Sequence, residues 1–471
     1  MNTDCRPSVT LARAQPLRVL HVSPTDIEGG AAMGAYGIHT ALRNAGVDSL
    51  MLVQRKYSTD ASVVTQGAGA QVLVEALRGR VDQLPLRFQR REPDNWWTVG
   101  VMPIRIASAV RRLHPDIVQF HWAGRGSAPI ETLRGISHLP IVWTLRDMWP
   151  LTGGCHYSAG CQRFLTGCGN CPQIGSHRAR DLSAWQWRRK QRSWRNVNIT
   201  FVALSRWMAN YARQSPLVFN NTVSIIPNGI DTQTFSPMDK TIARARWGLP
   251  QKRRIVMFGA LFGTHDPRKG FAYLRDALRG LAGRDEAKGM LAVIFGADET
   301  PEDLGVEAKY VGVVRGRTQL AELYASADVM VVPSTEENFG KTALEAMACG
   351  VPTVAFANTG QLDIIDHRIN GYLAEDRCAD DLARGILWCL DHERRTGSLS
   401  RNAREKAAKK FDIGVIAQEY VALYTRLLEA RRAAPSEFRK ETYHDAISAA
   451  AIVHGPLVAP ATTAGHGGGA A

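Results

Sequence analysis

Two glutamates in one short stretch have the residue types and the spacing to hold a sugar nucleotide. Glu337 and Glu345 lie eight positions apart, and Lys341 lies between them. Carboxylates accept paired hydrogen bonds from neighbouring hydroxyl groups, and a lysine adds a positive charge that suits phosphate. Eight helical positions at about 1.5 Å each cover roughly 12 Å, which is the scale of a nucleotide sugar.

The hydrophobic pattern predicts the elements that position these residues. Residues 328–332 predict a buried strand, residues 339–348 a helix, and a second strand restarts at Val351. Gly340 allows close approach to the backbone at the helix start, where the first N–H groups lack intrahelical partners. With the helix dipole, this end suits a diphosphate. The alternative is a plain strand–helix–strand unit with solvated glutamates.

The whole stretch, with its Phe339-Gly340 step and the run Glu-Ala-Met-Ala-Cys-Gly-Val-Pro from Glu345, resembles the donor-site signature of glycosyltransferase family 4. The resemblance covers roughly residues 17–428 and is strongest over residues 258–373. It implies the α/β GT-B fold, in which two Rossmann-like domains face each other across a cleft. It also implies retaining transfer of a sugar from a nucleotide diphosphate to a glycan or lipid-linked acceptor.

The resemblance assigns roles to individual residues. Glu345 is expected to contact the ribose hydroxyls and Glu337 the hydroxyls of the donor sugar. The residues expected to act in catalysis are His121, Glu337 and Lys269. The expected donor site comprises Gly29, Gly30, Arg268, Lys269, Val313, Glu337, Asn338, Phe339, Gly340, Lys341 and Glu345. No nucleophile is assigned, because the two carboxylates are expected to hold opposite ends of a donor rather than face one bond.

A second basic element precedes this stretch. Arg268 and Lys269 lie in a glycine-containing turn before a predicted helix, a position that suits a diphosphate. The family pattern has an arginine just after the preceding strand, where this chain has Ala260, so Arg268 or His265 is expected to substitute. A solvated basic turn is the alternative. Val313 is expected at the base-binding end, through backbone contacts.

The first half of the chain opens with a strand, a glycine-containing turn and a helix, as Rossmann-like domains do. No Gly-x-Gly-x-x-Gly fingerprint is present. Gly29 and Gly30 resemble the family 4 loop that closes over the donor phosphates and the acceptor; a plain turn is the alternative. His121 ends a buried strand, where ligands of open α/β sheets bind. It is expected to line the sugar site, with a structural histidine as the alternative.

The segment from Arg146 to Tyr157 resembles a family 4 subgroup that builds bacterial extracellular polysaccharides, of the colanic-acid type. A His-Asp pair is common at this point of the subgroup, and here Arg146 replaces the histidine before Asp147. Arg146 could instead bind an anionic group on the donor or the acceptor.

A glycine-rich loop after this segment holds half of the eight cysteines of the chain. The last two have zinc-knuckle spacing, and thiolates suit tetrahedral zinc, with His156 and His177 as spare ligands. A structural zinc site is one expectation and a loop of small buried thiols is the alternative. Catalysis is expected to need no cofactor, because no Asp-x-Asp motif ends a strand. The four cysteines are Cys155, Cys161, Cys168 and Cys171.

The length of 471 residues and the 45% hydrophobic content predict a globular protein with two domains. We expect an acceptor-binding domain over residues 17–234, which includes the cysteine-rich loop 151–178, and a donor-binding domain over residues 235–432 whose final helix crosses back. Residues 1–16 and 433–471 are expected to be disordered. No apolar run is long enough to cross a bilayer or to serve as a signal peptide, which favours a cytoplasmic location.

The net charge of +14 suggests an anionic partner. A UDP- or GDP-sugar is one, and the inner face of the plasma membrane is another. Arg87 to Arg91 with Trp96-Trp97, and Arg188 to Arg192 with Trp185, Trp187 and Trp194, combine cations with aromatic rings as membrane-surface segments do. The alternative is a basic helix face with its tryptophans in the core.

Two other classes of protein remain as alternatives. One is a basic protein that binds a membrane surface or nucleic acid, and the other is a nucleotide-sugar epimerase on the same fold. No zinc-finger or RNA-recognition pattern is present, so nucleic acid is not expected as a partner.

Overall fold

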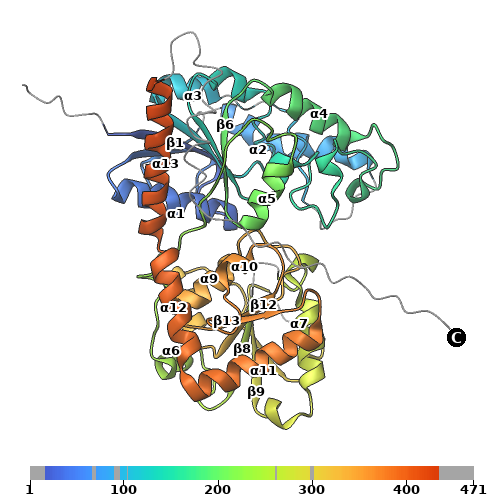
Figure 1. Cartoon of the computed structure of the whole chain (residues 1–471), viewed down its shortest axis with the longest axis vertical. Helices are drawn as coiled ribbons and strands as arrows, with labels where there is room; N and C mark the ends of the chain where they lie inside the picture. The colour runs from blue at the N-terminus through green and yellow to red at the C-terminus, as the bar shows by residue number, and fades with distance from the viewer. Residues whose placement is uncertain are drawn as a thin grey trace, which may run out of the picture.

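The computed structural model describes residues 16–65, 70–89, 96–102, 104, 106–259, 263–297 and 302–433. They form two α/β domains that follow each other along the chain and lie one above the other in Figure 1. The disorder expected for residues 1–16 and 433–471 concerns segments that fall almost entirely outside these ranges. Ala260, Arg90 and Arg91 also fall outside them.

The first domain is built on a parallel seven-stranded sheet in the order β3-β2-β1-β4-β5-β6-β7. The central strands are buried on both faces, as expected for a parallel sheet that helices cover on both sides. The strands are β1 Arg18–Thr25, β2 Asp48–Arg55, β3 Val63–Thr65, β4 Ile117–Phe120, β5 Ile141–Leu145, β6 Ile199–Ala203 and β7 Val223–Ile225.

The helices of this domain are set by local caps. The Asp181 side chain accepts from the backbone N–H of Ala184 at 3.0 Å at the start of α4, and Ser205 accepts from Met208 at 3.2 Å at the start of α5. The helices are α1 Gly30–Asn44, α2 Ala70–Gln83, α3 Ile106–Leu113, α4 Leu182–Trp194 and α5 Arg206–Gln214.

The second domain repeats the plan with a parallel six-stranded sheet in the order β10-β9-β8-β11-β12-β13. Its strands are β8 Arg254–Gly259, β9 Met290–Phe295, β10 Glu307–Tyr310, β11 Val329–Val332, β12 Thr353–Phe356 and β13 Gly371–Ala374. Its helices are α6 Lys240–Arg246, α7 Phe271–Leu281, α8 Arg317–Ala325, α9 Lys341–Ala348, α10 Gln361–Ile364, α11 Ala379–Thr396 and α12 Ser398–Lys410. The α/β architecture with two Rossmann-like domains is therefore confirmed.

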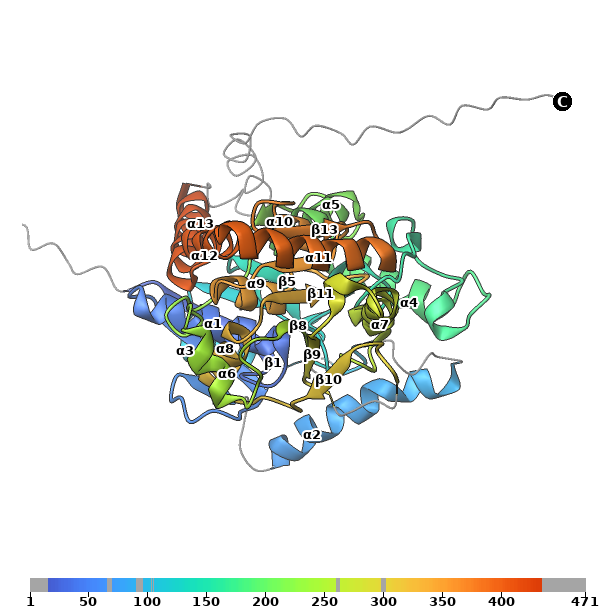
Figure 2. The same cartoon turned by 90° about the horizontal axis from the view of Figure 1, so that it is seen from below.

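The last helix, α13 (Ile413–Ala433), leaves the second domain and packs on the first. Figure 1 shows α12 on the lower domain and α13 running along the upper one, and Figure 2 shows the two helices at one side of the molecule. The apolar face of α13 lies against α1 and β1; its buried members are Ile416, Ala417, Tyr420, Leu423, Tyr424 and Leu427. In the described parts of the chain, no helix is both long enough and apolar enough to cross a membrane.

The two places where the chain passes between the domains are bonded to each other. The backbone N–H of Ile230, in the first passage, donates to the carbonyl of Phe411 at 2.7 Å. The N–H of Ile413, in the second, donates back to Ile230 at 2.8 Å. The Thr232 hydroxyl also donates to the carboxylate of Asp412. The connection between the domains is therefore a two-stranded crossing rather than a single linker.

We predict that Leu423→Ala lowers the free energy of unfolding by about 2–5 kcal/mol, because it removes a fully buried side chain between α13 and the first domain. Val415→Ala on the same helix is the control, since Val415 is 41% exposed and should change stability by about 0.5 kcal/mol or less. Urea unfolding of the full chain measures both. Equal effects of the two substitutions would contradict the packing of α13 on the first domain.

Candidate functional site

An ion pair between Lys269 and Glu337 lies where β11 passes into α9. The Lys269 ammonium lies 2.6 Å from a carboxylate oxygen of Glu337, although 67 residues separate the two along the chain. Sheet order explains the contact, because β8 and β11 are neighbours and the segments that follow them emerge at the same edge. Lys269 ends the short 3-10 turn Pro267–Lys269 that follows β8.

Glycine at position 270 lets these two segments touch. Gly270 has φ 73°, in the left-handed region, and a Cβ there would lie 1.8 Å from the carbonyl oxygen of Pro333. Any larger residue would push the Lys269 turn away from the end of β11. Gly340, with φ 74°, plays the corresponding backbone role at the start of α9.

The charge state of Glu337 follows from its surroundings. Burial raises the pKa of this carboxyl. The Lys269 ammonium and the Arg268 guanidinium lower it by more than burial raises it, so the pKa lies below its ordinary value. The carboxylate is therefore ionised at neutral pH and can only accept hydrogen bonds. A cation and an acceptor lie side by side, which suits a ligand that carries both phosphate and hydroxyl groups.

Glu345 lies elsewhere and has different partners. It is buried on α9, where it accepts a hydrogen bond from the Tyr324 hydroxyl at 3.0 Å. Its other oxygen lies 3.3 Å from the ammonium of Lys341, one turn earlier on the same helix. Lys341 is half-exposed. Glu337 and Glu345 thus belong to two separate acid–base pairs, one before α9 and one within it.

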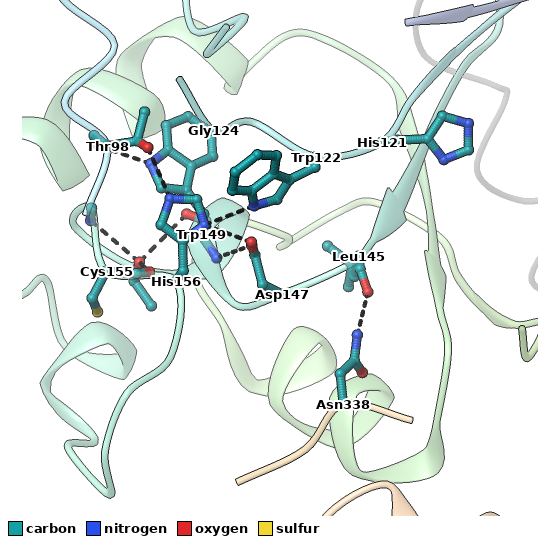
Figure 3. Close-up of polar contacts among 12 residues, drawn as sticks. Thr98, His121, Trp122, Gly124, Leu145, Asp147, Trp149, Cys155, His156 and Asn338 are labelled. Carbon is teal, nitrogen blue, oxygen red and sulfur yellow. Dashed lines mark hydrogen bonds and ion pairs between the residues drawn. The ribbon is translucent and has the colours of Figure 1, made fainter. Parts of the chain in front are cut away.

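Three consecutive side chains before α9 face three different partners. Glu336 accepts from the N–H and the hydroxyl of Ser158, both at 3.2 Å, and from the N–H of Ala159 at 3.0 Å, all in the first domain. Glu337 pairs with Lys269, and the Asn338 amide donates to the carbonyl of Leu145, at the end of β5, at 2.7 Å (Figure 3).

Phe339, the next residue, is buried against Phe411, with ring centroids 5.5 Å apart. Sequence reasoning missed Glu336. The adjacent pair of acidic residues was visible, but nothing in it told which one would face the other domain.

Arg268 provides a second contact across the domains. Its guanidinium lies over the ring of Tyr157, 4.2 Å from the centroid, and 2.6 Å from the carboxylate of Asp266. Tyr157 comes from the cysteine-rich loop of the first domain, next to Ser158. The basic turn and the loop before α9 therefore both hold this cysteine-rich loop.

His121 lies in a buried basic cluster at the end of β4. Its Nε2 is 3.0 Å from Nδ1 of His21, and its Nδ1 is 3.4 Å from a guanidinium nitrogen of Arg146. Burial lowers the pKa of His121, and the charge of Arg146 lowers it further, so the imidazole is neutral at pH 7. Arg146 also donates to the side-chain oxygen of Asn228 at 2.5 Å. Within the described chain, Nε of Arg146 and Nε2 of His21 are buried without a hydrogen-bond partner.

A buried Asp–His pair supports the loop beyond β5. The Asp147 carboxylate accepts from Nδ1 of His156 at 2.5 Å, and Nε2 of His156 lies 2.8 Å from the Thr98 hydroxyl. Figure 3 shows Asp147 and His156 turned toward each other, with His121 directed away from them. Both residues stood out in the sequence, but their pairing did not, because it depends on how the loop folds back.

The remaining expected donor residues lie in open positions. Gly29, with φ 89°, precedes α1 and Gly30 is its first residue; a Cβ at either would meet nothing within 4 Å. Val313 is half-exposed beyond β10. In the described chain, no hydrogen bond or ion pair joins any of these three residues to the Lys269 or Glu337 side chain.

A cavity of about 800 Å³ lies between the domains beside this site. That volume is within the range of ligand pockets. Residues of both domains line it, among them Ser158, Trp207, Arg268, Thr335 and Glu336.

Two facing Rossmann-like domains, with an acid–base site at the strand ends between them, define the class of GT-B glycosyltransferases. Comparison with known proteins agrees. Residues 28–234 match the family model described as Glycosyltransferase Family 4, and residues 239–410 match the model described as Glycosyl transferases group 1. Together the two matches cover most of both domains. The chain belongs to the glycosyltransferase family that these two models describe, and it is a glycosyltransferase.

Curated relatives carry similar names. An uncharacterized glycosyltransferase of Methanocaldococcus jannaschii is 33% identical over 225 residues, which is 45% of this chain and 57% of that protein. D-inositol 3-phosphate glycosyltransferase of Mycolicibacterium smegmatis is 27% identical over 439 residues, which is 88% of this chain and 91% of that protein. The chain thus spans little more than half of the first relative and nearly all of the second.

Solved structures share the fold. Sucrose-phosphate synthase from Thermosynechococcus elongatus superposes with a TM-score of 0.62 at 20% identity, over 88% of this chain and all of that one. HepE from Anabaena, in complex with UDP and glucose, superposes with a TM-score of 0.58 at 18% identity, over 87% of this chain and all of that one. At this level of identity the likeness shows the GT-B fold.

We predict that Lys269→Met lowers the free energy of unfolding at pH 7 by about 1–3 kcal/mol, because it leaves the Glu337 carboxylate without its cation. The folded pKa of Glu337 lies below the ordinary value of 4.5. The stabilisation is therefore present above pH 4.5 and is lost as the pH falls through the lowered pKa. Urea unfolding at several pH values from 7 downward measures the difference between the variant and the wild type, which should narrow on acidification.

Lys240→Met is the matched control for this experiment. Lys240 pairs with Asp328 at 2.7 Å, but it is more exposed and Asp328 keeps a second partner in Arg244. The control substitution should lower the free energy of unfolding by about 1 kcal/mol or less. A Lys269→Met variant as stable as the control at pH 7 would contradict the assigned ion pair.

Proposed function

We propose that this glycosyltransferase moves a sugar from a UDP- or GDP-sugar to a glycan or lipid-linked acceptor in surface polysaccharide assembly, with retention of the anomeric configuration. The observation that carries the proposal is the Lys269–Glu337 pair at 2.6 Å, beside the start of α9. A fixed ammonium next to a fixed hydroxyl acceptor suits the junction between a diphosphate and a sugar. No cofactor is assigned to the reaction.

The charge of each residue in the proposed donor site indicates which part of the donor it would bind. Negative charge grows on the departing diphosphate, and Lys269, Lys341 and the N–H groups at the start of α9 are the donors that would stabilise it. Glu337 would hold hydroxyls of the transferred sugar and Glu345 those of the ribose. Support for a uridine donor comes from HepE, which has been solved in complex with UDP and with UDP-glucose.

The acceptor side is proposed to lie at the strand ends of the first domain. His121 is neutral and would line the sugar site as a hydrogen-bonding group. Arg146 has a buried Nε without a partner in the described chain, which supports a role for its guanidinium in binding an anionic group of the donor or acceptor. Gly29 and Gly30, at the open start of α1, would close over the phosphates.

We also propose that the first domain docks on an anionic membrane surface, where a lipid-linked acceptor would be found. Support comes from a set of exposed side chains on and after α2, which we call the aromatic edge and define as Leu77, Leu84, Phe88 and Trp96 together with Arg87; Phe88 is 89% exposed. They come from α2, the following 3-10 turn Leu84–Phe88 and the segment after it. Figure 2 shows α2 at the edge of the molecule.

The second basic aromatic segment is a weaker candidate for membrane contact. Trp187 and Trp194 lie in the core and Lys190 is fully buried, which leaves Trp185 half-exposed beside Arg189.

We expect Glu345→Gln to lower kcat/KM for the donor roughly 10- to 100-fold, the equivalent of losing one charge-assisted hydrogen bond to the ribose. Glu405→Gln is the control. Glu405 also forms an ion pair with a lysine four positions away on the same helix, but at an exposed position of α12. Transfer and slow donor hydrolysis are assayed with a panel of UDP- and GDP-sugars, and the product configuration is read by NMR. Unchanged turnover would overturn the ribose assignment, and an inverted product would overturn retention.

Phe88→Ser should weaken binding to vesicles that contain anionic lipid several-fold, because it removes the most exposed aromatic side chain of the aromatic edge. Co-sedimentation at low and high salt measures binding, which should fall with salt. Phe219→Ser is the control, since Phe219 is also strongly exposed but lies before β7, outside the aromatic edge. Wild-type protein that does not sediment with these vesicles would contradict membrane docking.

A further inference from the structure

The four cysteines of the glycine-rich loop converge on one small cavity. Cys155, Cys161, Cys168 and Cys171 all line a void of about 20 Å³, which has room for one or two water-sized occupants. All four are free thiols rather than disulfides. They come from a single stretch of seventeen residues, so the loop itself gathers them.

The four thiols line the same void, but they are not close enough together to hold a metal ion. In the described part of the chain, no three His, Cys, Asp or Glu side chains are drawn together closely enough to hold a metal ion as they stand. His156 is unavailable to the thiols, because Asp147 and Thr98 engage both of its ring nitrogens. The candidate ligand set is therefore the four sulfurs alone.

Lys190 supplies an independent reason to place negative charge in this loop. Its side chain is 0% exposed, and its ammonium donates to the carbonyls of Trp149 at 2.5 Å and Thr152 at 2.9 Å. The ammonium also lies 3.3 Å from the centroid of the Trp149 ring. A buried ammonium is costly unless negative charge lies nearby.

The turn between the last two cysteines is strained, and a bound ion would hold it in that conformation. Cys168, Gly169 and Asn170 have φ values of 59°, 97° and 47°. Non-glycine residues in this region are strained and persist only where their surroundings hold them. An ion bound by Cys168 and Cys171 would fasten both ends of this turn.

We propose that Cys155, Cys161, Cys168 and Cys171 form a structural tetrathiolate site for Zn²⁺. Zn–thiolate bonds are about 2.3 Å long, so the four side chains would move to bring their sulfurs to that distance from one ion. One Zn²⁺ displaces four thiol protons, which leaves a complex of net charge −2 beside the Lys190 ammonium. No bond to substrate is involved, so the site is structural.

The position of the site explains what it would do for the enzyme. Tyr157, Ser158 and Ala159 lie between Cys155 and Cys161, and they are the residues that reach Arg268 and Glu336 of the second domain. A metal that closes the loop would therefore hold the contact surface between the domains. This inference does not depend on which sugar or acceptor the enzyme uses.

Metal analysis of the full-length protein, purified without chelators, tests the site. We expect about one equivalent of zinc per chain, and less than about a third of an equivalent in Cys168→Ser and Cys171→Ser. Cys378→Ser is the matched control, because Cys378 is a partly exposed free cysteine of the second domain and should leave the zinc content unchanged. Zinc-free wild type, or zinc that survives both loop substitutions, overturns the proposal.

Thiol counting distinguishes the alternatives. The chain has eight cysteines. After denaturation in chelator without reductant, a zinc protein yields eight reactive thiols, and its zinc is recovered bound to the chelator. A count of eight without released metal indicates a loop of plain buried thiols, and a lower count indicates disulfides; either result overturns the site.

Cobalt substitution keeps the test decisive if the serine variants fail to fold. Co²⁺ bound by four thiolates gives intense sulfur-to-metal absorption, which oxygen and nitrogen ligands do not. The wild-type chain, stripped of its metal by a chelator that is then removed, should show this absorption when titrated with one equivalent of Co²⁺ and lose it when Zn²⁺ is added. Absence of the sulfur bands would contradict tetrathiolate binding.

Discussion

The loop between β11 and α9 forms hydrogen bonds with both domains at once, and the geometry of the site depends on these contacts. Glu336 and Asn338 face the first domain, through Ser158 and the carbonyl of Leu145. Glu337, between them, faces Lys269 of its own domain. The pair that would hold the donor is therefore internal to the second domain, whereas its two neighbours depend on how the domains face each other. A change in domain angle would break the outer contacts and spare the central one.

The crossing between the domains limits how such a change can occur. Ile230 is bonded to Phe411 and Ile413, so the two passages of the chain move as one unit. Beyond them α13 buries an apolar face against the first domain. On the opposite side, the contacts of Tyr157 and Ser158 link the cysteine-rich loop to the second domain. The domains are thus joined by covalent passages on one side and by polar contacts at the cleft.

The positive charge of the chain is not all on its surface. Lys190 is fully buried and Arg146 is nearly so; in the described chain, Lys190 donates to two backbone carbonyls and Arg146 to the side-chain oxygen of Asn228. Lys190 lies next to the cysteine-rich loop and Arg146 follows β5, two segments that the sequence analysis singled out. Buried cations of this kind are costly unless something compensates them. An anionic ligand for Arg146 and a metal–thiolate complex for Lys190 would each provide that compensation, and neither could be inferred from a net charge of +14.

The sequence by itself determined the alternation of strands and helices, the glycine turns and the acidic signature at α9, because these are local patterns with a fixed period or spacing. It also indicated that the four cysteines belong together, since seventeen residues cannot separate them far. Only the tertiary structure decided the partners: Lys269 for Glu337, Tyr324 for Glu345, Asp147 for His156 and Ser158 for Glu336. Those contacts follow from strand order, loop folding and the approach of two domains, which bring together residues that the spacing along the chain does not relate.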